Sequence, residues 1–192
     1  VDGDHQRECA GEIAEQLEKI VAIARRHDPV ELRESKSAEE SALIWKGRKS
    51  AFGAMGQIAD YICLDGTIPV SELPFVLRRI GELTASYGLG VANVFHAGDG
   101  NMHPLILYDA NKPGDLAKAE ALGFDILRLC VEVGGCLTGE HGVGVEKRDL
   151  MDVQYAPADL EAQLRVKDVF DPRWLLNPAK VFPLKVTESR RA

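Results

Sequence analysis

Two histidines bracket a short glycine-rich segment and could together bind a metal ion. His96 and His103 flank the sequence Ala-Gly-Asp-Gly-Asn-Met, which is rich in turn-forming residues. If this segment closes a hairpin with His96 opposite His103, their Cβ atoms lie about 4.5–5.5 Å apart on one face. Two neutral imidazoles at that separation can each reach one divalent ion at about 2.0–2.1 Å. The alternative is a polar hairpin tip whose two histidines have no ligand role.

A second glycine-rich segment carries a carboxylate next to an imidazole. Glu140 and His141 lie in the sequence Gly-Glu-His-Gly-Val-Gly at residues 139–144. Adjacent side chains in a loop point in different directions, so one can hold a metal while the other meets a substrate. Two histidines and one carboxylate leave coordination positions open, as catalytic metal sites require. The alternative is a flexible glycine loop with two exposed polar residues.

Two further segments could bind anionic groups. Arg48 lies in the cationic sequence Trp-Lys-Gly-Arg-Lys, and arginine can hold a small carboxylate through two parallel hydrogen bonds. Asn177 and Lys180 lie in Leu-Asn-Pro-Ala-Lys, a tight turn that presents an amide and a cation. The alternatives are a solvated helix face for the first segment and a plain chain terminator for the second.

The elements expected to position these residues follow the order β-α-β-β-α-β between residues 60 and 138. Strands are predicted at 60–64, 91–95, 103–108 and 136–138 from their β-rich composition and bounding turns. One helix, capped by Ser71 and ended by Gly88, follows the first strand, and a second runs from Leu116 to Cys130. This order predicts an α+β fold, the ferredoxin-like arrangement of an antiparallel sheet with helices on one face.

The flanking regions are predicted to be mainly helical. A helix is expected over 4–27, a short strand at 30–34, and a second helix opened by the capping box of Ser37 and Glu40 and ending near residue 53. After the glycine loop come a helix near 145–153 and another opened by Pro157 with Leu160, Leu164 and Val169 inward, then an irregular tail. We therefore expect one domain, with an N-terminal helical part and the sheet over 1–138 and a helical tail over 139–192.

Composition narrows the classes of function. The net charge of −7 argues against nucleic acid or an anionic membrane as the main partner, and the apolar runs are far shorter than the roughly 18 residues needed to span a bilayer. The four cysteines, Cys9, Cys63, Cys130 and Cys136, form no CxxC pair. We expect them to be buried thiols of a cytoplasmic protein, with Cys63 a core residue that has no chemical role.

The longest motifs resemble those of a known family. They are Asn93 to Pro104, Gly134 to Gly144, Phe170 to Pro172, Leu176 to Lys180 and Trp45 to Lys49. Together they are similar to the C-terminal domain of FAD-linked oxidases of the vanillyl-alcohol-oxidase superfamily. The resemblance is greater to the FAD-linked subunits of bacterial glycolate oxidases than to D-lactate and D-2-hydroxyglutarate dehydrogenases, and it covers nearly the whole chain.

The resemblance implies a substrate (cap) domain that covers a separate N-terminal FAD-binding domain. It implies oxidation of a small 2-hydroxy acid, of the glycolate or D-lactate class, by hydride transfer to flavin, with partner subunits that include an iron–sulfur subunit. The sequence starts at Val1 and contains no Walker-A loop and no GxGxxG after a strand, so we expect a fragment that holds half of an active site and is inactive alone. We also expect self-association through the exposed flavin-facing side, and membrane association only through partner subunits.

The resemblance also implies roles for individual residues. The positions of His96, His103 and Glu140 match ligands of zinc or a similar divalent ion, and that of His141 matches the base beside the flavin. Arg48 matches an arginine that holds the substrate carboxylate. The remaining matches are to flavin-contacting positions: Asn101, Asn177 and Lys180. The sequence departs from the family at Ala179, where glycine is usual, and a methyl group there is expected to shift the turn.

Two other classes of function fit the same residues. One is a stand-alone metal- or ligand-binding module without redox activity. The other is a metallohydrolase in which His96, His103 and Glu140 hold zinc and His141 activates water. Flavin chemistry requires an upstream domain, whereas a hydrolase would act without flavin and be abolished by a chelator.

Overall fold

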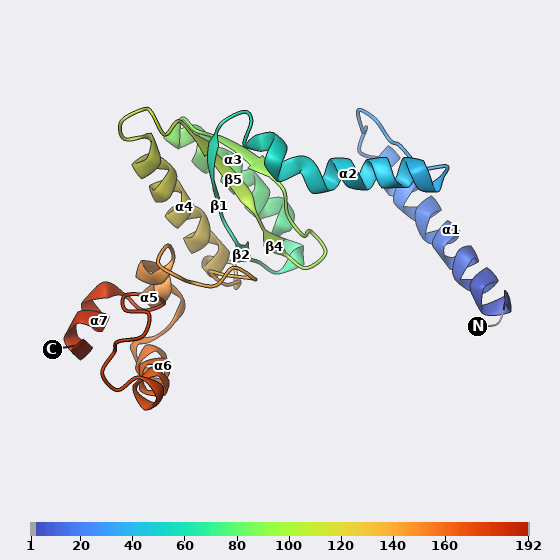
Figure 1. Cartoon of the computed structure of the whole chain (residues 1–192). Helices are drawn as coiled ribbons and strands as arrows, with labels where there is room; N and C mark the ends of the chain where they lie inside the picture. Colours follow the sequence, from blue (N-terminus) through green and yellow to red (C-terminus); the bar gives the residue numbers. More distant parts are fainter. Residues whose placement is uncertain (1–2, 192) are drawn as a thin grey trace. The chain divides into compact units, whose positions relative to one another are not determined.

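The computed structural model describes residues 3–191, with side chains over 11–188, and divides into two compact units. The first unit is Val1–Lys49 and the second is Ser50–Ala192. Within the described residues, none of the helices combines the length and apolar character that crossing a bilayer requires. The second unit contains the sheet (Figure 1), and by its residue range it also contains most of the predicted site residues.

The N-terminal part of the chain is helical, as predicted. Helix α1 is Gly3–Arg25 and helix α2 is Ala38–Met55. The capping box of α2 is formed: the Glu40 backbone N–H donates to Ser37 Oγ at 3.2 Å, and the Glu40 carboxylate accepts from the Lys36 N–H at 2.8 Å. The strand predicted at 30–34 is wrong, because these residues pair with no other strand and have no regular structure.

The second unit is built on an antiparallel sheet of short strands. The strands are β1 (Asp60–Cys63), β2 (Gly66–Thr67), β3 (Gly90–Asn93), β4 (Asn101–Met102) and β5 (Pro104–Tyr108). They form one sheet in the order β1-β5-β3 and a second, two-stranded sheet of β2 and β4. The strand predicted at 136–138 is reduced to one bridge between Thr67 and Cys136.

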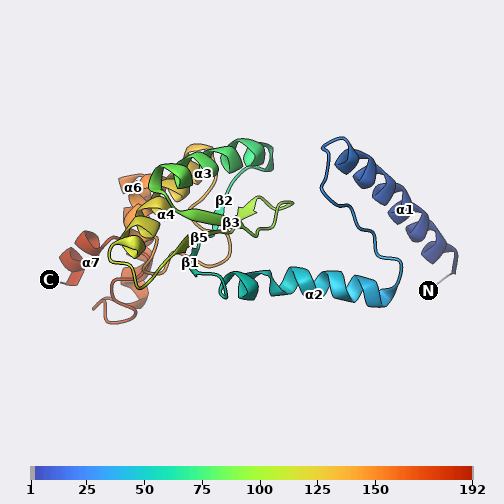
Figure 2. The same cartoon turned by 90° about the horizontal axis from the view of Figure 1, so that it is seen from above.

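Two long helices cover one face of the sheet. Helix α3 (Leu73–Tyr87) and helix α4 (Asp115–Glu132) pack on each other and on the strands (Figures 1 and 2). The core between these layers includes Val76, Ile80, Ile106, Leu122 and Ile126, none more than 1% exposed. This confirms the predicted α+β class with a small antiparallel sheet.

The ends of α3 test two of the predicted stop and start signals. Gly88 ends the helix in the left-handed conformation at φ +65°, as predicted. The predicted capping by Ser71 is wrong, since Ser71 lies inside a short 3₁₀ turn, Val70–Glu72, and Glu72 is the N-cap without a side-chain bond. The helix is instead started by Pro74 in its first turn.

Alternation along β5 gives the sheet a second face, opposite α3 and α4, that carries polar groups. Ile62 and Val91 lie opposite Ile106 in the register and belong to the core side. Because successive side chains of a strand point to opposite faces, Cys63 and its register partner Leu105 belong to the other face, together with His103. The polar residues of the hairpin and of the β1 end therefore gather on the face that α3 and α4 leave open.

The C-terminal part contains short helices. They are a 3₁₀ turn at Arg148–Leu150, α5 (Met151–Gln154), α6 (Pro157–Phe170) and α7 (Leu184–Arg191). Pro157 starts α6 and Leu160 and Leu164 are buried, as predicted. Val169 is 75% exposed, so its predicted inward position is wrong, and α7 was expected as irregular chain.

Candidate functional site

His103 is the fixed centre of a polar cluster on the sheet face opposite α3 and α4. It lies between β4 and β5 in the chain, and its side chain is 3% exposed and packs edge-on against Phe52 of α2, with 6.4 Å between ring centroids. The Nδ1 atom is 3.0 Å from the Leu64 carbonyl oxygen, which can only accept, so Nδ1 carries the hydrogen and donates it. The other ring nitrogen, Nε2, lies 3.0 Å from Glu140 Oε1. In this neutral tautomer Nε2 and Glu140 both present lone pairs, so a proton or a metal cation is needed between them.

His96 reaches the same carboxylate from the other strand of the hairpin. The predicted pairing of His96 with His103 is wrong, because His96 pairs with Asn101 and His103 lies opposite Val94. His96 is thus a diagonal neighbour of His103 on the same face, within reach of a long side chain. The two rings are 5.6 Å apart between centroids, and His96 Nε2 is 3.8 Å from Glu140 Oε1. The structure therefore places both His96 and His103 beside the Glu140 carboxylate. Among the described residues, the set around Glu140 whose ligand atoms all lie within 4.8 Å of one another joins His103 and Glu140 to Asp65 and His141 rather than to His96.

His141 stands beside this cluster and is exposed. Its ring stacks on that of His103, with 5.0 Å between centroids and 10° between planes. A ligand atom of His141 lies within 4.8 Å of ligand atoms of Asp65, His103 and Glu140. An exposed imidazole next to a buried one can exchange a proton with a bound molecule while the buried ring stays in place.

The loop that carries Glu140 and His141 is anchored by Asp65. The Asp65 side chain is fully buried and accepts hydrogen bonds from the backbone N–H groups of residues 139–141, at 2.9–3.2 Å. Thr138 Oγ1 donates to it at 2.6 Å and the buried Lys147 Nζ at 3.0 Å. Asp65 thus fixes three consecutive residues that include a predicted ligand and the predicted base.

Asp65 is held as a carboxylate by these donors. Burial opposes its ionisation, but the hydrogen bonds and the Lys147 ammonium outweigh this effect and hold the pKa of the Asp65 carboxyl far below its usual range. The sequence analysis gave no role to Asp65 or Lys147. The available signal was an acid placed directly after an apolar strand and beside a glycine.

Gly139, in the loop that carries Glu140, lies directly against the side chain of Asn101. Asn101 is 8% exposed and its Oδ1 has no hydrogen-bond partner within the described part of the chain. A Cβ atom at Gly139 would lie 2.7 Å from that Oδ1, so only glycine permits this close approach. The site therefore keeps a buried, unpaired amide oxygen beside the loop that carries Glu140.

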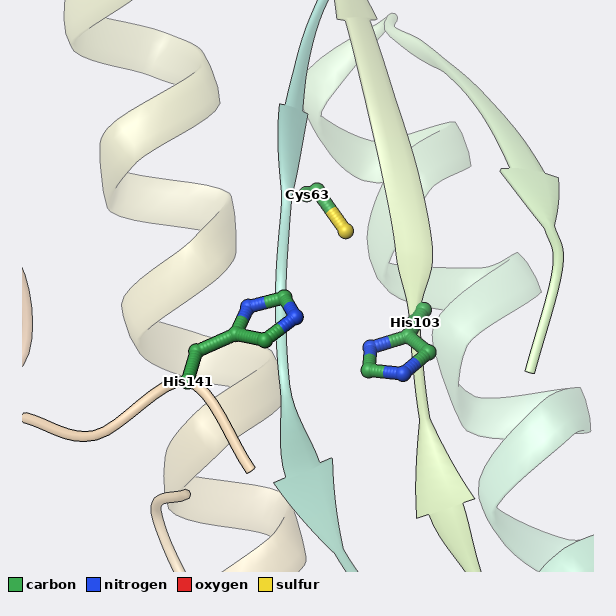
Figure 3. Close-up of side chains that lie close together, drawn as sticks. All are labelled: Cys63, His103 and His141. Atoms are coloured by element: carbon green, nitrogen blue, oxygen red, sulfur yellow. The ribbon is translucent and has the colours of Figure 1, made fainter. Parts of the chain in front are cut away.

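Cys63 also belongs to the cluster and is only half-buried, so its predicted place in the core is wrong. Its Sγ is 3.4 Å from the Leu64 carbonyl oxygen, and Figure 3 shows the side chain directed toward the rings of His103 and His141. Burial and the charge of Asp65 raise the pKa of the thiol to about 11, so Cys63 is not a nucleophile at neutral pH.

The other cysteines only partly fit the prediction of buried thiols. Cys130 is buried, and burial raises the pKa of its thiol to about 12. Cys136 is exposed, against prediction, and Cys63 is only half-buried. The side chain of Cys9 lies outside the described residues.

Comparison with known proteins identifies the family. A family model described as FAD linked oxidases, C-terminal domain, matches residues 2–181. The chain belongs to this family. It is 50% identical over 184 residues to glycolate oxidase subunit GlcD of Escherichia coli (strain K12), covering 95% of this chain and 35% of that protein.

Two more distant relatives also match most of this chain. Glycolate oxidase subunit GlcD of Bacillus subtilis (strain 168) is 33% identical over 167 residues, covering 86% of this chain and 36% of the relative. D-lactate dehydrogenase [cytochrome], mitochondrial, of Arabidopsis thaliana is 28% identical over 172 residues, covering 88% of this chain and 30% of the relative. This FAD-linked oxidase C-terminal domain thus spans about a third of the length of the curated relatives it matches.

Three predicted residues of this FAD-linked oxidase C-terminal domain remain to be described, Arg48, Asn177 and Lys180. Arg48 is exposed on α2 within the first compact unit. Asn177 and Lys180 are exposed and contact each other, with Lys180 Nζ donating to Asn177 Oδ1 at 3.3 Å. Their turn is tied to the site loop, since the Val181 N–H donates to the Gly144 carbonyl at 2.7 Å. The roles of these three residues stay predictions.

The turn that carries Asn177 and Lys180 is strained at Ala179. Ala179 has φ +62°, a left-handed conformation that costs an alanine about 1–2 kcal/mol. Arg148 Nη1 holds this geometry by donating to the Ala179 carbonyl at 2.6 Å. The Ala179 methyl group is therefore accommodated at the cost of backbone strain.

Replacing Ala179 with glycine is expected to stabilise the chain. Relief of the left-handed strain exceeds the extra unfolded-state freedom of glycine, so the free energy of unfolding should rise by about 0.5–1 kcal/mol in urea denaturation. Ala162→Gly, on the exposed side of α6, is the matched control and should lower it by about 1 kcal/mol. Equal destabilisation by both variants would contradict the assigned strain.

Proposed function

We propose that this chain is the substrate-facing domain of an FAD-dependent enzyme that oxidises a small 2-hydroxy acid of the glycolate or D-lactate class. The observation that carries the proposal is the convergence of His96, His103 and Glu140 beside the exposed ring of His141. Family membership and the names of the relatives, which are a glycolate oxidase subunit and a D-lactate dehydrogenase, support this class of substrate.

The donor set fits a divalent metal ion. His103 Nε2 and Glu140 Oε1 face each other with lone pairs, and His96 Nε2 is directed to the same oxygen. The bond from His103 Nδ1–H to the Leu64 carbonyl fixes the ring as metal-binding histidines require. Two imidazoles and a carboxylate suit zinc, iron or manganese. When bound, the ion supplies a Lewis acid that favours loss of the substrate hydroxyl proton, and FAD supplies the hydride acceptor.

The residues of this chain would then position the substrate and move its proton. A ring nitrogen of His141 accepts the hydroxyl proton, which its exposure and its place next to the ligands allow. Arg48 binds the substrate carboxylate through two hydrogen bonds. Asn101, Asn177 and Lys180 contact the flavin, and the unpaired Oδ1 of Asn101 fits a role in binding a polar group.

The proposed partner is an N-terminal FAD-binding domain of the same protein. The chain covers 35% of the E. coli relative, which leaves ample length for such a domain. A group of exposed apolar side chains precedes and enters the Asn177 turn, and it is formed by Val166, Val169, Phe170, Leu175 and Leu176. These side chains suit a surface that another domain covers. Other subunits, including an iron–sulfur subunit, are further proposed partners.

We also propose that the second unit has the ferredoxin-like topology. Its support is the antiparallel pairing of the 60–67 segment with the 101–108 segment, and of the latter with β3. In this interpretation the Thr67–Cys136 bridge takes the place of the fourth strand, on the free side of the first.

The decisive experiment joins this chain to the upstream FAD-binding domain. The joined protein should bind flavin and reduce an artificial electron acceptor with glycolate or D-lactate, whereas the chain alone should not. Activity that needs no flavin and disappears with a chelator would identify a metallohydrolase. Metal binding without turnover in either form would identify a simple binding module.

Removal of His103 is expected to abolish metal binding. The chain purified with Mn²⁺ or Zn²⁺ should hold one ion by mass spectrometry, and His103→Ala should hold roughly a hundredth or less because a buried ligand is lost. His27→Ala, an exposed histidine outside the site, is the control and should retain the ion. Equal metal content in both variants would contradict the ligand assignment.

A further inference from the structure

Cys63, which the proposed function does not use, lies on the same face as the histidines. It is the last residue of β1 and pairs in register with Leu105, two residues beyond His103. The sulfur and the two rings of His103 and His141 face one another in Figure 3. One ligand atom from each of these three residues lies within 4.8 Å of the other two.

The Leu64 carbonyl marks where a second ion would bind. It accepts from His103 Nδ1 at 3.0 Å and from Cys63 Sγ at 3.4 Å, so both donors converge at one oxygen. A cation that replaced these two hydrogens would bind Nδ1 and the thiolate, and the thiol proton would pass to solvent. A tetrahedral ion with bonds of about 2.0–2.3 Å needs its donors roughly 3.3–3.8 Å apart, which the exposed His141 can approach by turning.

The Cys63–His103–His141 set and the His96–His103–Glu140 set cannot both bind an ion at the same time, because they share the ring of His103. A neutral imidazole has one lone pair, so an ion on Nδ1 moves the hydrogen to Nε2. That nitrogen already lies 3.0 Å from Glu140 Oε1 and would then donate to it. Glu140 would change from a metal ligand to the acceptor of a carboxylate–histidine–metal arrangement.

We propose that Cys63, His103 and His141 form a second, sulfur-containing site for soft divalent ions such as Cd²⁺, and that it competes with the His96–His103–Glu140 site. Thiolate and imidazole donors favour soft ions, whereas a carboxylate in the set favours Mn²⁺. A soft ion bound here also occupies His141, the proposed base. Soft ions are therefore inhibitors of the enzyme to which this domain belongs, while Mn²⁺ is not. The binding itself does not depend on the proposed redox function.

Cadmium titration of the chain tests this site directly. In a Cys9→Ser, Cys136→Ser background, Cd²⁺ should produce the ultraviolet absorption of a cadmium–thiolate bond with one equivalent of ion. Cys63→Ser should abolish this absorption and weaken Cd²⁺ binding by roughly ten-fold or more. Cys63→Ala is a second variant with the same expected loss. Absorption that persists in a folded Cys63 variant would overturn the proposal.

Glu140→Gln is the matched variant that separates the two sites. It should weaken Mn²⁺ binding and leave the cadmium–thiolate absorption in place, whereas Cys63→Ser should leave Mn²⁺ binding in place. Added Mn²⁺ should raise the Cd²⁺ concentration needed for half-saturation, and Cd²⁺ and Mn²⁺ bound together would refute the competition. A chain that shows the cadmium signal but binds no Mn²⁺ would refute the proposed catalytic metal and leave this second site standing.

Discussion

Asp65→Asn is expected to lower the free energy of unfolding of the second unit by about 3–5 kcal/mol, the cost of leaving a buried charge without its partner. The variant keeps the size of the side chain but removes the charge that faces the Lys147 ammonium at 3.0 Å. It also replaces one acceptor oxygen with an NH₂ group, which cannot accept from the N–H groups of residues 139–141. Urea denaturation followed by circular dichroism measures the loss.

The double variant with Lys147→Met identifies the source of this loss. Removing the ammonium as well should restore part of the stability, because no unpaired charge then stays buried. Asp99→Asn, at the exposed tip of the hairpin, is the matched control and should change the free energy of unfolding by less than about 0.5 kcal/mol. A loss of similar size at Asp65 and Asp99 would show that the buried carboxylate does not anchor the loop.

Local sequence signals placed the two long helices and the strands β1, β3 and β5, but not the register of the hairpin. Periodic apolar residues and glycine stops placed α3 and α4, because the same residues that mark the pattern form the core. The pairing of His96 with Asn101 depends on how many residues the hairpin loop takes up, which the turn residues alone did not fix. The two histidines still meet because a diagonal neighbour across the hairpin is close enough for imidazole side chains.

Contacts between segments that lie far apart in the chain could not be predicted from the sequence. Asp65 meets Lys147 across 82 residues, and neither residue lies in a motif that indicates a buried pair. Cys63 was predicted as a core residue because its strand is apolar, but the end of β1 faces the polar side of the sheet. The segment at 30–34 has β-forming residues and no neighbouring strand, and a strand without hydrogen-bond partners does not form.

His141→Gln is expected to lower kcat of the joined flavoprotein by about 10²–10⁴-fold, the usual contribution of a positioned general base. Glutamine keeps a polar side chain in the loop but cannot accept and hold the hydroxyl proton. The backbone N–H of residue 141 still donates to Asp65, so the loop should keep its place. Because substrate binding is assigned to the metal and Arg48, KM should change little, and steady-state oxidation of glycolate and D-lactate measures both constants.

The metal and flavin contents of the His141→Gln protein show whether the fall in kcat comes from the missing base or from a lost metal or cofactor. Both should match those of the unaltered protein, because His103, His96 and Glu140 hold the proposed ion without His141. Arg48→Lys provides the contrast: it keeps the charge but loses the paired hydrogen bonds, so KM should rise while kcat falls less. If His141→Gln instead lost the metal in parallel with activity, His141 would be a ligand of the resident ion. Another group near the site would then have to accept the substrate hydroxyl proton.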